Sequence, residues 1–201
     1  MKTICVYCSS SDRAPRPYVQ AAHELAAAMA VHGYNLVYGG ASVGLMGRIA
    51  FEVRSLGGRV TGVIPQKLAN KGLILEGIDE CVVTRDMRDR KRIMDERSDA
   101  FIALPGGFGT LEELLEIITL KQLQYHNKPV VLLNISGFFD GLITLFERIF
   151  NENFARREFS GLYYLAPTVP DAIRYVREYV PPPPVEKWGM EPPKGDEGAQ
   201  K

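Results

Sequence analysis

The chain has 201 residues, of which 46% are hydrophobic and 24% are charged, and its 24 basic and 24 acidic side chains cancel. This composition predicts one soluble domain with a substantial core, and the zero net charge excludes an overall field that would attract nucleic acid or an anionic membrane. No apolar run approaches the roughly 18 residues that span a bilayer, and the N-terminal sequence MKTICVYCSS lacks the features of a signal peptide. Three cysteines, an odd number, indicate buried thiols in a reducing, cytoplasmic setting.

Strands and helices alternate through the first part of the chain. The first strand, 3–10, is apolar and β-branched, and an alanine-rich helix at 15–33 follows it, with Pro17 in its first turn and Gly33 as its stop. The pattern then predicts a strand at 34–40, a helix at 43–58, a strand at 59–65, a loop without periodicity at 66–79 and a strand at 80–85.

The second part continues this alternation. A helix at 86–97 has Asp86 as its N-cap, and an apolar strand at 100–105 leads into the glycine-rich segment PGGFGT. The remaining elements are helices at 110–125, 138–154 and 170–180 and a strand at 128–134. Buried parallel strands alternating with helices predict an α/β fold, a Rossmann-like doubly wound parallel sheet with helices on both faces. We expect one nucleotide-binding domain at 1–180 and a proline-rich C-terminal tail at 181–201.

Two glycine-rich turns, GGASVGLMG at 39–47 and PGGFGT at 105–110, each follow a strand and precede a helix. Ligands of such folds bind at this edge of the sheet, and glycines there let free helix-start amides approach a phosphate. The alternative is that the glycines only permit tight turns. The segment after Gly109 lacks the lysine of a Walker loop, and the first strand ends in CSSSDR rather than a dinucleotide fingerprint. The pattern favours a mononucleotide, with Gly39 and Gly40 among its contacts.

Charged residues stand at two unexpected places on the predicted helices. On a helical wheel, Arg90 and Lys91 fall among the methionines Met87 and Met94, which should face the core. Snorkelling or a structural ion pair would explain Lys91, whereas a buried arginine usually holds a carboxylate or a phosphate. The helix after PGGFGT begins with paired glutamates, which complement its dipole. The dipole alone does not explain why two carboxylates adjoin a phosphate-type loop.

The motifs PGGFGTLEE and MRDRK together resemble those of the Lonely Guy family, whose members are often mislabelled lysine decarboxylases. The resemblance runs from VYCSSS through LVYGGASVGLMG and past KPVVLLN, and so covers most of the chain apart from the proline-rich tail. It implies a homodimeric phosphoribohydrolase that cleaves the N-glycosidic bond of a cytokinin ribotide or of AMP, giving the free base and ribose 5-phosphate. Arg88 stands where a histidine is common in the family. No lysine has the context of a pyridoxal phosphate Schiff base, so we reject a decarboxylase and expect neither cofactor nor metal.

Carried over residue by residue, the resemblance implies that Arg90 and Glu113 form the catalytic pair. It also implies substrate contacts from Arg90, Lys91, Gly106, Gly107, Phe108, Gly109, Thr110, Leu111, Glu112 and Thr119. Glycosidic cleavage develops positive charge on the sugar ring, and a fixed carboxylate can stabilise that charge and position water. Arginine stays protonated and is therefore expected to orient Glu113 or to grip ribose or phosphate oxygens.

A non-catalytic nucleotide- or cofactor-binding carrier of the same fold is the alternative function. Related carriers share PGG loops but need not keep both Arg90 and Glu113, so the presence of both residues favours the enzyme. Cys5 and Cys8 lie in a strand without a second cysteine pair, which disfavours a redox motif or a zinc site. The expected partners are a small-molecule nucleotide and a second copy of the chain, with no nucleic acid and no membrane.

Overall fold

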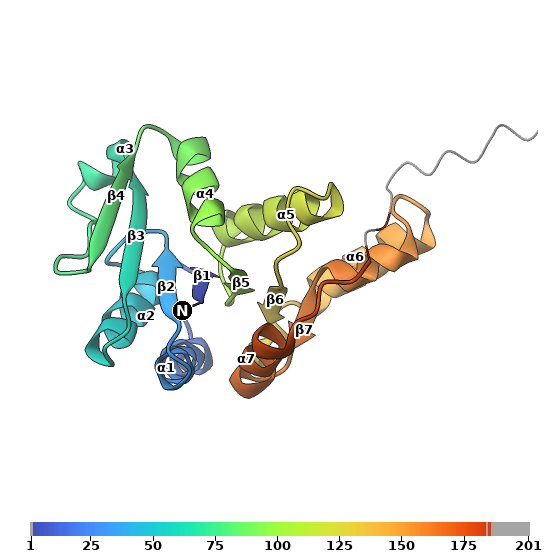
Figure 1. Ribbon diagram of the computed structural model, residues 1–201, viewed down its shortest axis with the longest axis horizontal. Coiled ribbons are helices and arrows are strands. Elements are labelled where there is room, and N and C mark those ends of the chain that lie inside the picture. The colour runs from blue at the N-terminus through green and yellow to red at the C-terminus, as the bar shows by residue number, and fades with distance from the viewer. Residues whose placement is uncertain (1, 184, 186–201) are drawn as a thin grey trace, which may run out of the picture.

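The computed structural model describes residues 2–183 and residue 185, and these residues form a seven-stranded sheet in which all neighbouring strands run parallel (Figure 1). The strand order is β4-β3-β2-β1-β5-β6-β7. The strands are β1 (Thr3–Tyr7), β2 (Asn35–Tyr38), β3 (Val60–Pro65), β4 (Glu80–Thr84), β5 (Ala100–Ala103), β6 (Val130–Leu133) and β7 (Tyr164–Ala166). Every residue of β3, β5 and β6 is buried, which explains the uninterrupted apolar sequences of β5 and β6.

Helices cover both faces of this sheet (Figure 1). One face packs against α1 (Arg16–Val31), α2 (Gly44–Ser55) and α7 (Val169–Glu178). The other face packs against α4 (Met87–Glu96), α5 (Phe108–Gln122) and α6 (Asp140–Asn151). Three short helical segments complete the fold, α3 (Gln66–Ala69), η1 (Ile135–Gly137) and η2 (Arg157–Leu162). The predicted doubly wound α/β fold is therefore confirmed. None of the helices in these residues is long and apolar enough to cross a membrane.

The predicted helix ends follow from local chemistry. Asp86 caps α4 as expected, since its Oδ1 accepts hydrogen bonds from the backbone N–H groups of Arg88 at 3.0 Å and Asp89 at 2.9 Å. Gly33, directly after α1, has a φ of 65°, which a residue with a side chain rarely adopts. The helix α5 begins at Phe108, inside the glycine segment and two residues before the predicted start.

Four details of the sequence prediction were wrong. Residues 66–79 include the short helix α3, and Ala41 forms an isolated bridge with Ile74. The strand β7 was missed, because it has only three residues and just one of them is buried. Cys81 is exposed rather than buried, since β4 is an edge strand whose alternate residues face solvent. Met87, in the first turn of α4, was predicted to face the core but is 46% exposed. The predicted tail lies outside the described residues from position 186 onward.

The strand order places a topological switch point between β1 and β5. From β1 the chain adds strands in one direction through β2 and β3 to β4, and then adds β5, β6 and β7 in the other direction. Two connections therefore diverge at the carboxyl ends of β1 and β5, and a crevice opens there in folds of this kind. The segment PGGFGT follows β5 directly, so it borders this crevice.

Candidate active site

A buried ion pair joins α4 to α5 at the carboxyl edge of the sheet. Arg90 Nη1 donates to Glu113 Oε1 at 2.5 Å, and Arg90 Nε donates to the backbone oxygen of Val63 at 2.9 Å. Arg90 is only 6% exposed and Glu113 only 9%. Attraction within a buried ion pair barely offsets the loss of hydration, so such a pair is weak evidence for a stabilising role. Its position at the switch point instead suits a functional role.

Gly39, at the end of β2, makes this arrangement possible. A Cβ atom at Gly39 would overlap Arg90 Nη2, so only glycine leaves room for the guanidinium. The sequence pattern predicted Gly39 and Gly40 as substrate contacts, but the structure gives Gly39 a packing role beneath Arg90. Gly40, with a φ of 78°, is buried against β3. A contact of either glycine with substrate stays a prediction.

Lys91 extends the charged network toward solvent. Its Nζ forms ion pairs with both Glu112 and Glu116. Burial lowers the pKa of Lys91, but the hydrogen bonds to these two carboxylates outweigh that effect and hold the pKa above its ordinary value. Lys91 therefore stays protonated and adds a fixed positive charge beside the Arg90–Glu113 pair. The predicted core-facing position of Lys91 is partly right, since 17% of its side chain is exposed.

The glycine segment after β5 presents an open helix start. Gly107 is the N-cap residue of α5, no side chain caps this end, and Gly107, Phe108 and Gly109 are all exposed. A Cβ atom at Gly107 would meet nothing within 4 Å. Gly106 instead packs against the side chain of Thr110. The first amides of α5 therefore point to accessible space, the arrangement that binds anions at helix N-termini.

In the other glycine turn, GGASVGLMG at 39–47, the amides at the helix start already have hydrogen-bond partners within the chain. The backbone N–H of Gly44, at the start of α2, donates to Asp12 Oδ1 at 2.8 Å. The N–H of Leu45 donates to the backbone oxygen of Ser9 at 2.9 Å. Residues from the β1–α1 connection thus occupy the helix start that a phosphate would need. Of the two glycine turns, the PGGFGT segment is therefore the one whose helix start is open.

Six of the predicted site residues line one or both of two hollows beside α5, and the others line neither. Glu113 lines a cavity of about 130 Å³ between α4 and α5, together with Lys91, Glu116 and Tyr7. An open groove of about 670 Å³ lies on the outer side of α5 and includes Phe108, Leu111, Glu112 and Thr119. The hydroxyl of Thr119 donates to the backbone oxygen of Leu115 at 2.7 Å. Sequence reasoning missed Tyr7, although its place at the end of β1, beside the switch point, was a usable signal.

Burial sets the protonation behaviour of Glu113. Loss of hydration raises the pKa of its carboxyl above the ordinary value of 4.5, and the Arg90 guanidinium offsets part of that rise. If ionised Glu113 is required for catalysis, activity should fall with decreasing pH through this raised pKa. We expect the acid limb of kcat/KM to lie above pH 4.5, and a profile of log kcat/KM against pH checks it. A plateau that continues down to pH 4.5 would contradict this role of Glu113.

The described residues contain no group of three or more His, Cys, Asp or Glu side chains arranged to hold a metal ion. The switch point brings together one buried carboxylate, one buried guanidinium, one protonated lysine and the backbone amides of a helix start.

Comparison with known proteins shows the family to which this chain belongs. Residues 46–176 match a family model described as possible lysine decarboxylase. A cytokinin riboside 5′-monophosphate phosphoribohydrolase of Arabidopsis thaliana is 44% identical over 180 residues, which cover 90% of this chain and 84% of that protein. A probable enzyme of the same name from Oryza sativa is also 44% identical, over 90% of this chain and 74% of its own length. The chain belongs to the Lonely Guy family.

Solved structures place this Lonely Guy protein among carriers of the same fold. The molybdenum cofactor carrier protein of Chlamydomonas reinhardtii is 26% identical, with a TM-score of 0.68 over 88% of this chain and 96% of that one. The molybdenum cofactor binding protein of Rippkaea orientalis, 24% identical with a TM-score of 0.67, shares the fold. The fold is thus common to hydrolases and carriers, and the side chains of the site must distinguish them.

Proposed function

We propose that this protein hydrolyses the N-glycosidic bond of a purine nucleoside 5′-monophosphate, either AMP or a cytokinin-type ribotide, to the free base and ribose 5-phosphate. The Arg90–Glu113 pair carries this proposal, because it places a buried carboxylate beside an open phosphate-binding helix start. Relatives that are 44% identical over 90% of the chain have this activity in their names.

The proposed mechanism assigns Glu113 to the sugar. The bond between C1′ and the base nitrogen breaks, the base leaves with the electron pair, and positive charge develops on the ribose ring. The buried carboxylate of Glu113 stabilises that charge and positions the water that attacks C1′. The oxygen of this water forms the new bond to C1′, and in the net reaction one of its protons ends on the departing base nitrogen. Arg90 is a positioning residue, because its Nη1 contact fixes one carboxylate oxygen and its Nε contact anchors the guanidinium to β3.

The 5′-phosphate is proposed to bind at the start of α5. Exposed Gly107 and the free amides that follow it supply donors, and the helix dipole favours the negative charge. Lys91 adds a positive charge to the cavity that Glu113 lines, where it pairs with Glu112 and Glu116 across the α4–α5 interface. The phosphate would thus be held by groups that do not react, while Glu113 acts on the bond at the other side of the ribose.

A panel of nucleoside monophosphates tests the assignment and identifies the preferred base. Each is incubated with the protein, and the released base is followed by chromatography. We expect release from AMP or from N⁶-modified AMP. Tight binding of a nucleotide without release of any base would favour the carrier function instead.

We further propose that the protein acts as a homodimer through the outer side of α5. Phe108 is 93% exposed and Leu115 is 41% exposed, and both line the groove that also contains Glu112 and Thr119. A second copy seated on this groove would cover the apolar side chains and enclose residues implied to contact the substrate.

A cytoplasmic location is also proposed, supported by the free, buried thiols of Cys5 and Cys8.

Light scattering at micromolar concentration should give the mass of a dimer. Leu115→Glu places a charge in the proposed interface and should shift the mass toward a monomer and lower the activity. Leu145→Glu is the matched control, since Leu145 is 52% exposed on α6, away from the groove. A fully active monomeric wild type would contradict this assembly.

A further inference from the structure

Lys121, in the last turn of α5, is a buried amine that the proposed reaction does not use. The residue is only 5% exposed, and among the described residues its Nζ has no hydrogen-bond partner. The Nζ lies 4.8 Å from the centre of the Tyr179 ring, a cation–π contact. Burial lowers the pKa of Lys121 to about 8. Buried ammonium groups in proteins are almost always paired, so an unpaired one points to a missing anionic partner.

A cavity of about 390 Å³ adjoins this amine. Its lining combines Lys121, Gln124 and His126 with the apolar side chains of Phe159, Leu162 and Val185. The cavity lies between the C-terminal end of α5, η2 and the segment that follows α7. It shares none of its lining with the cavity at Glu113. Eight residues of helix separate Lys121 from Glu113, about 12 Å along the axis, so this is a second site.

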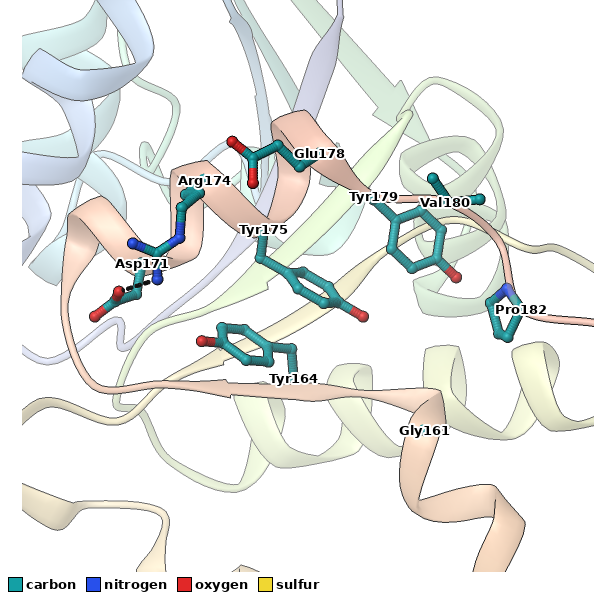
Figure 2. Close-up of a pocket in the computed structure, with 9 residues that line it drawn as sticks. All are labelled: Gly161, Tyr164, Asp171, Arg174, Tyr175, Glu178, Tyr179, Val180 and Pro182. Carbon is teal, nitrogen blue, oxygen red and sulfur yellow. Dashed lines mark hydrogen bonds and ion pairs between the residues drawn. The ribbon is translucent and has the colours of Figure 1, made fainter.

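Figure 2 shows a neighbouring hollow that Tyr179 lines. There the ring of Tyr164 stacks on that of Tyr175 with centroids 4.3 Å apart, and Tyr179 and Pro182 lie at one end. The two hollows share Gly161 and Pro182. Tyr179 therefore lines this aromatic hollow and also contacts the unpaired amine of Lys121.

The charges around this cavity favour a single negative charge on the occupant. Burial lowers the pKa of His126, and its Nε2 is engaged with the backbone oxygen of Ile117 at 2.9 Å, so the ring is neutral at pH 7. Glu158 is the acidic residue of the lining and opposes further negative charge. The C-terminal end of α5 carries a partial negative charge, which also disfavours a dianion such as phosphate. One ammonium group remains to pair with one anionic group.

We propose that this cavity binds a small molecule with one carboxylate on an apolar body. The carboxylate accepts a hydrogen bond from Lys121 Nζ. The Nε2 of Gln124 donates one N–H to the backbone oxygen of Val185 at 3.3 Å, and its second N–H can donate to the carboxylate. The apolar body contacts Phe159, Leu162 and Val185, where it displaces water from apolar surface. The site is separate from the nucleotide site and stands even if the proposed hydrolysis fails.

The test uses hexanoate, phenylacetate and cyclohexanecarboxylate as probes, with the corresponding primary amides as uncharged counterparts. Binding to the full-length protein is measured by ligand-observed NMR at millimolar concentrations. We expect at least one carboxylate to bind, and its amide to bind about tenfold to a hundredfold more weakly, as expected when a charge-assisted hydrogen bond is lost. Lys121→Met should remove this preference, whereas Lys67→Met, at an exposed position on α3, should keep it.

Two further measurements guard against ambiguous outcomes. Lys121→Met should unfold at the same temperature as the wild type or higher, because methionine fills the site without an unpaired charge. In the wild type, the bound probe should show intermolecular NOEs to the Leu162 methyl groups, which needs no variant. Failure of all three carboxylates to bind, equal binding of acid and amide, or displacement of the probe by AMP would overturn the proposal.

Discussion

Replacing Glu113 with glutamine should lower kcat on the order of 10²–10³-fold while nucleotide binding persists. The amide keeps the size of the side chain but removes the charge that stabilises the developing cation on the ribose. Because the positive charge on the ribose appears only in the transition state, the variant should lose kcat rather than affinity for the nucleotide. Steady-state kinetics and direct titration of the nucleotide check the two parts separately. Wild-type base release by this variant would reduce Glu113 to an acid that complements the helix dipole, and the carrier function would move ahead.

Variants of Arg90 should lose activity to a similar degree. Arg90→Ala removes both the contact to Glu113 and the one to Val63, and Arg90→Lys should not restore activity because a single ammonium cannot make both. If Arg90 acts through Glu113, the double variant should be little worse than either single one. Arg92→Ala is the comparison on the same helix. Arg92 lines the cavity at Glu113, but it pairs with Asp89 and Glu96 on the exposed side and contacts neither Arg90 nor Glu113 through an ion pair, so its replacement should be nearly silent.

The second large effect concerns the 5′-phosphate. AMP should be cleaved with a kcat/KM roughly 10²–10⁴-fold above that of adenosine, the range expected from two charge-assisted hydrogen bonds. Binding energy from a phosphate remote from C1′ holds the sugar in place against Glu113. Parallel assays of the two substrates measure this ratio. Equal turnover of AMP and adenosine would show that the 5′-phosphate does not contribute to catalysis at this site.

Gly107→Val locates the phosphate within the site. A Cβ atom at Gly107 meets nothing within 4 Å, and its φ of −87° suits any residue, so the fold should be unchanged. The added side chain would occupy the space in front of the α5 amides and should raise KM for AMP or abolish its binding. Gly141→Val, at an equally open position on α6, is the matched control. An unchanged KM for Gly107→Val would place the phosphate elsewhere.

The fold could be predicted because its strands are buried on both faces. Short, uninterrupted apolar runs such as those of β5 and β6 are typical of strands buried on both faces. Because helices connect these strands, a parallel sheet is the arrangement that fits the pattern. The three-residue strand β7 could not be found in this way, because its pairing with β6 depends on the rest of the sheet rather than on its own pattern.

The site was predictable where a residue contradicts its local environment. Arg90 stands out on a polar helix because it falls on the core side, and the structure shows it buried against Glu113. The difference between the two glycine turns was not predictable. Asp12, which closes the helix start at Gly44, lies 32 residues earlier in the chain, so only the folded structure shows which turn is open.

The products formed from AMP test the central claim most directly. The protein is incubated with AMP, and the four possible products, adenine, ribose 5-phosphate, adenosine and inorganic phosphate, are quantified together. The proposed cleavage at C1′ predicts equal molar amounts of adenine and ribose 5-phosphate, and at least about a hundredfold less of each from Glu113→Gln over the same interval. Adenosine and inorganic phosphate in their place, or binding of AMP with no product at all when N⁶-modified AMP is also unreactive, would contradict it.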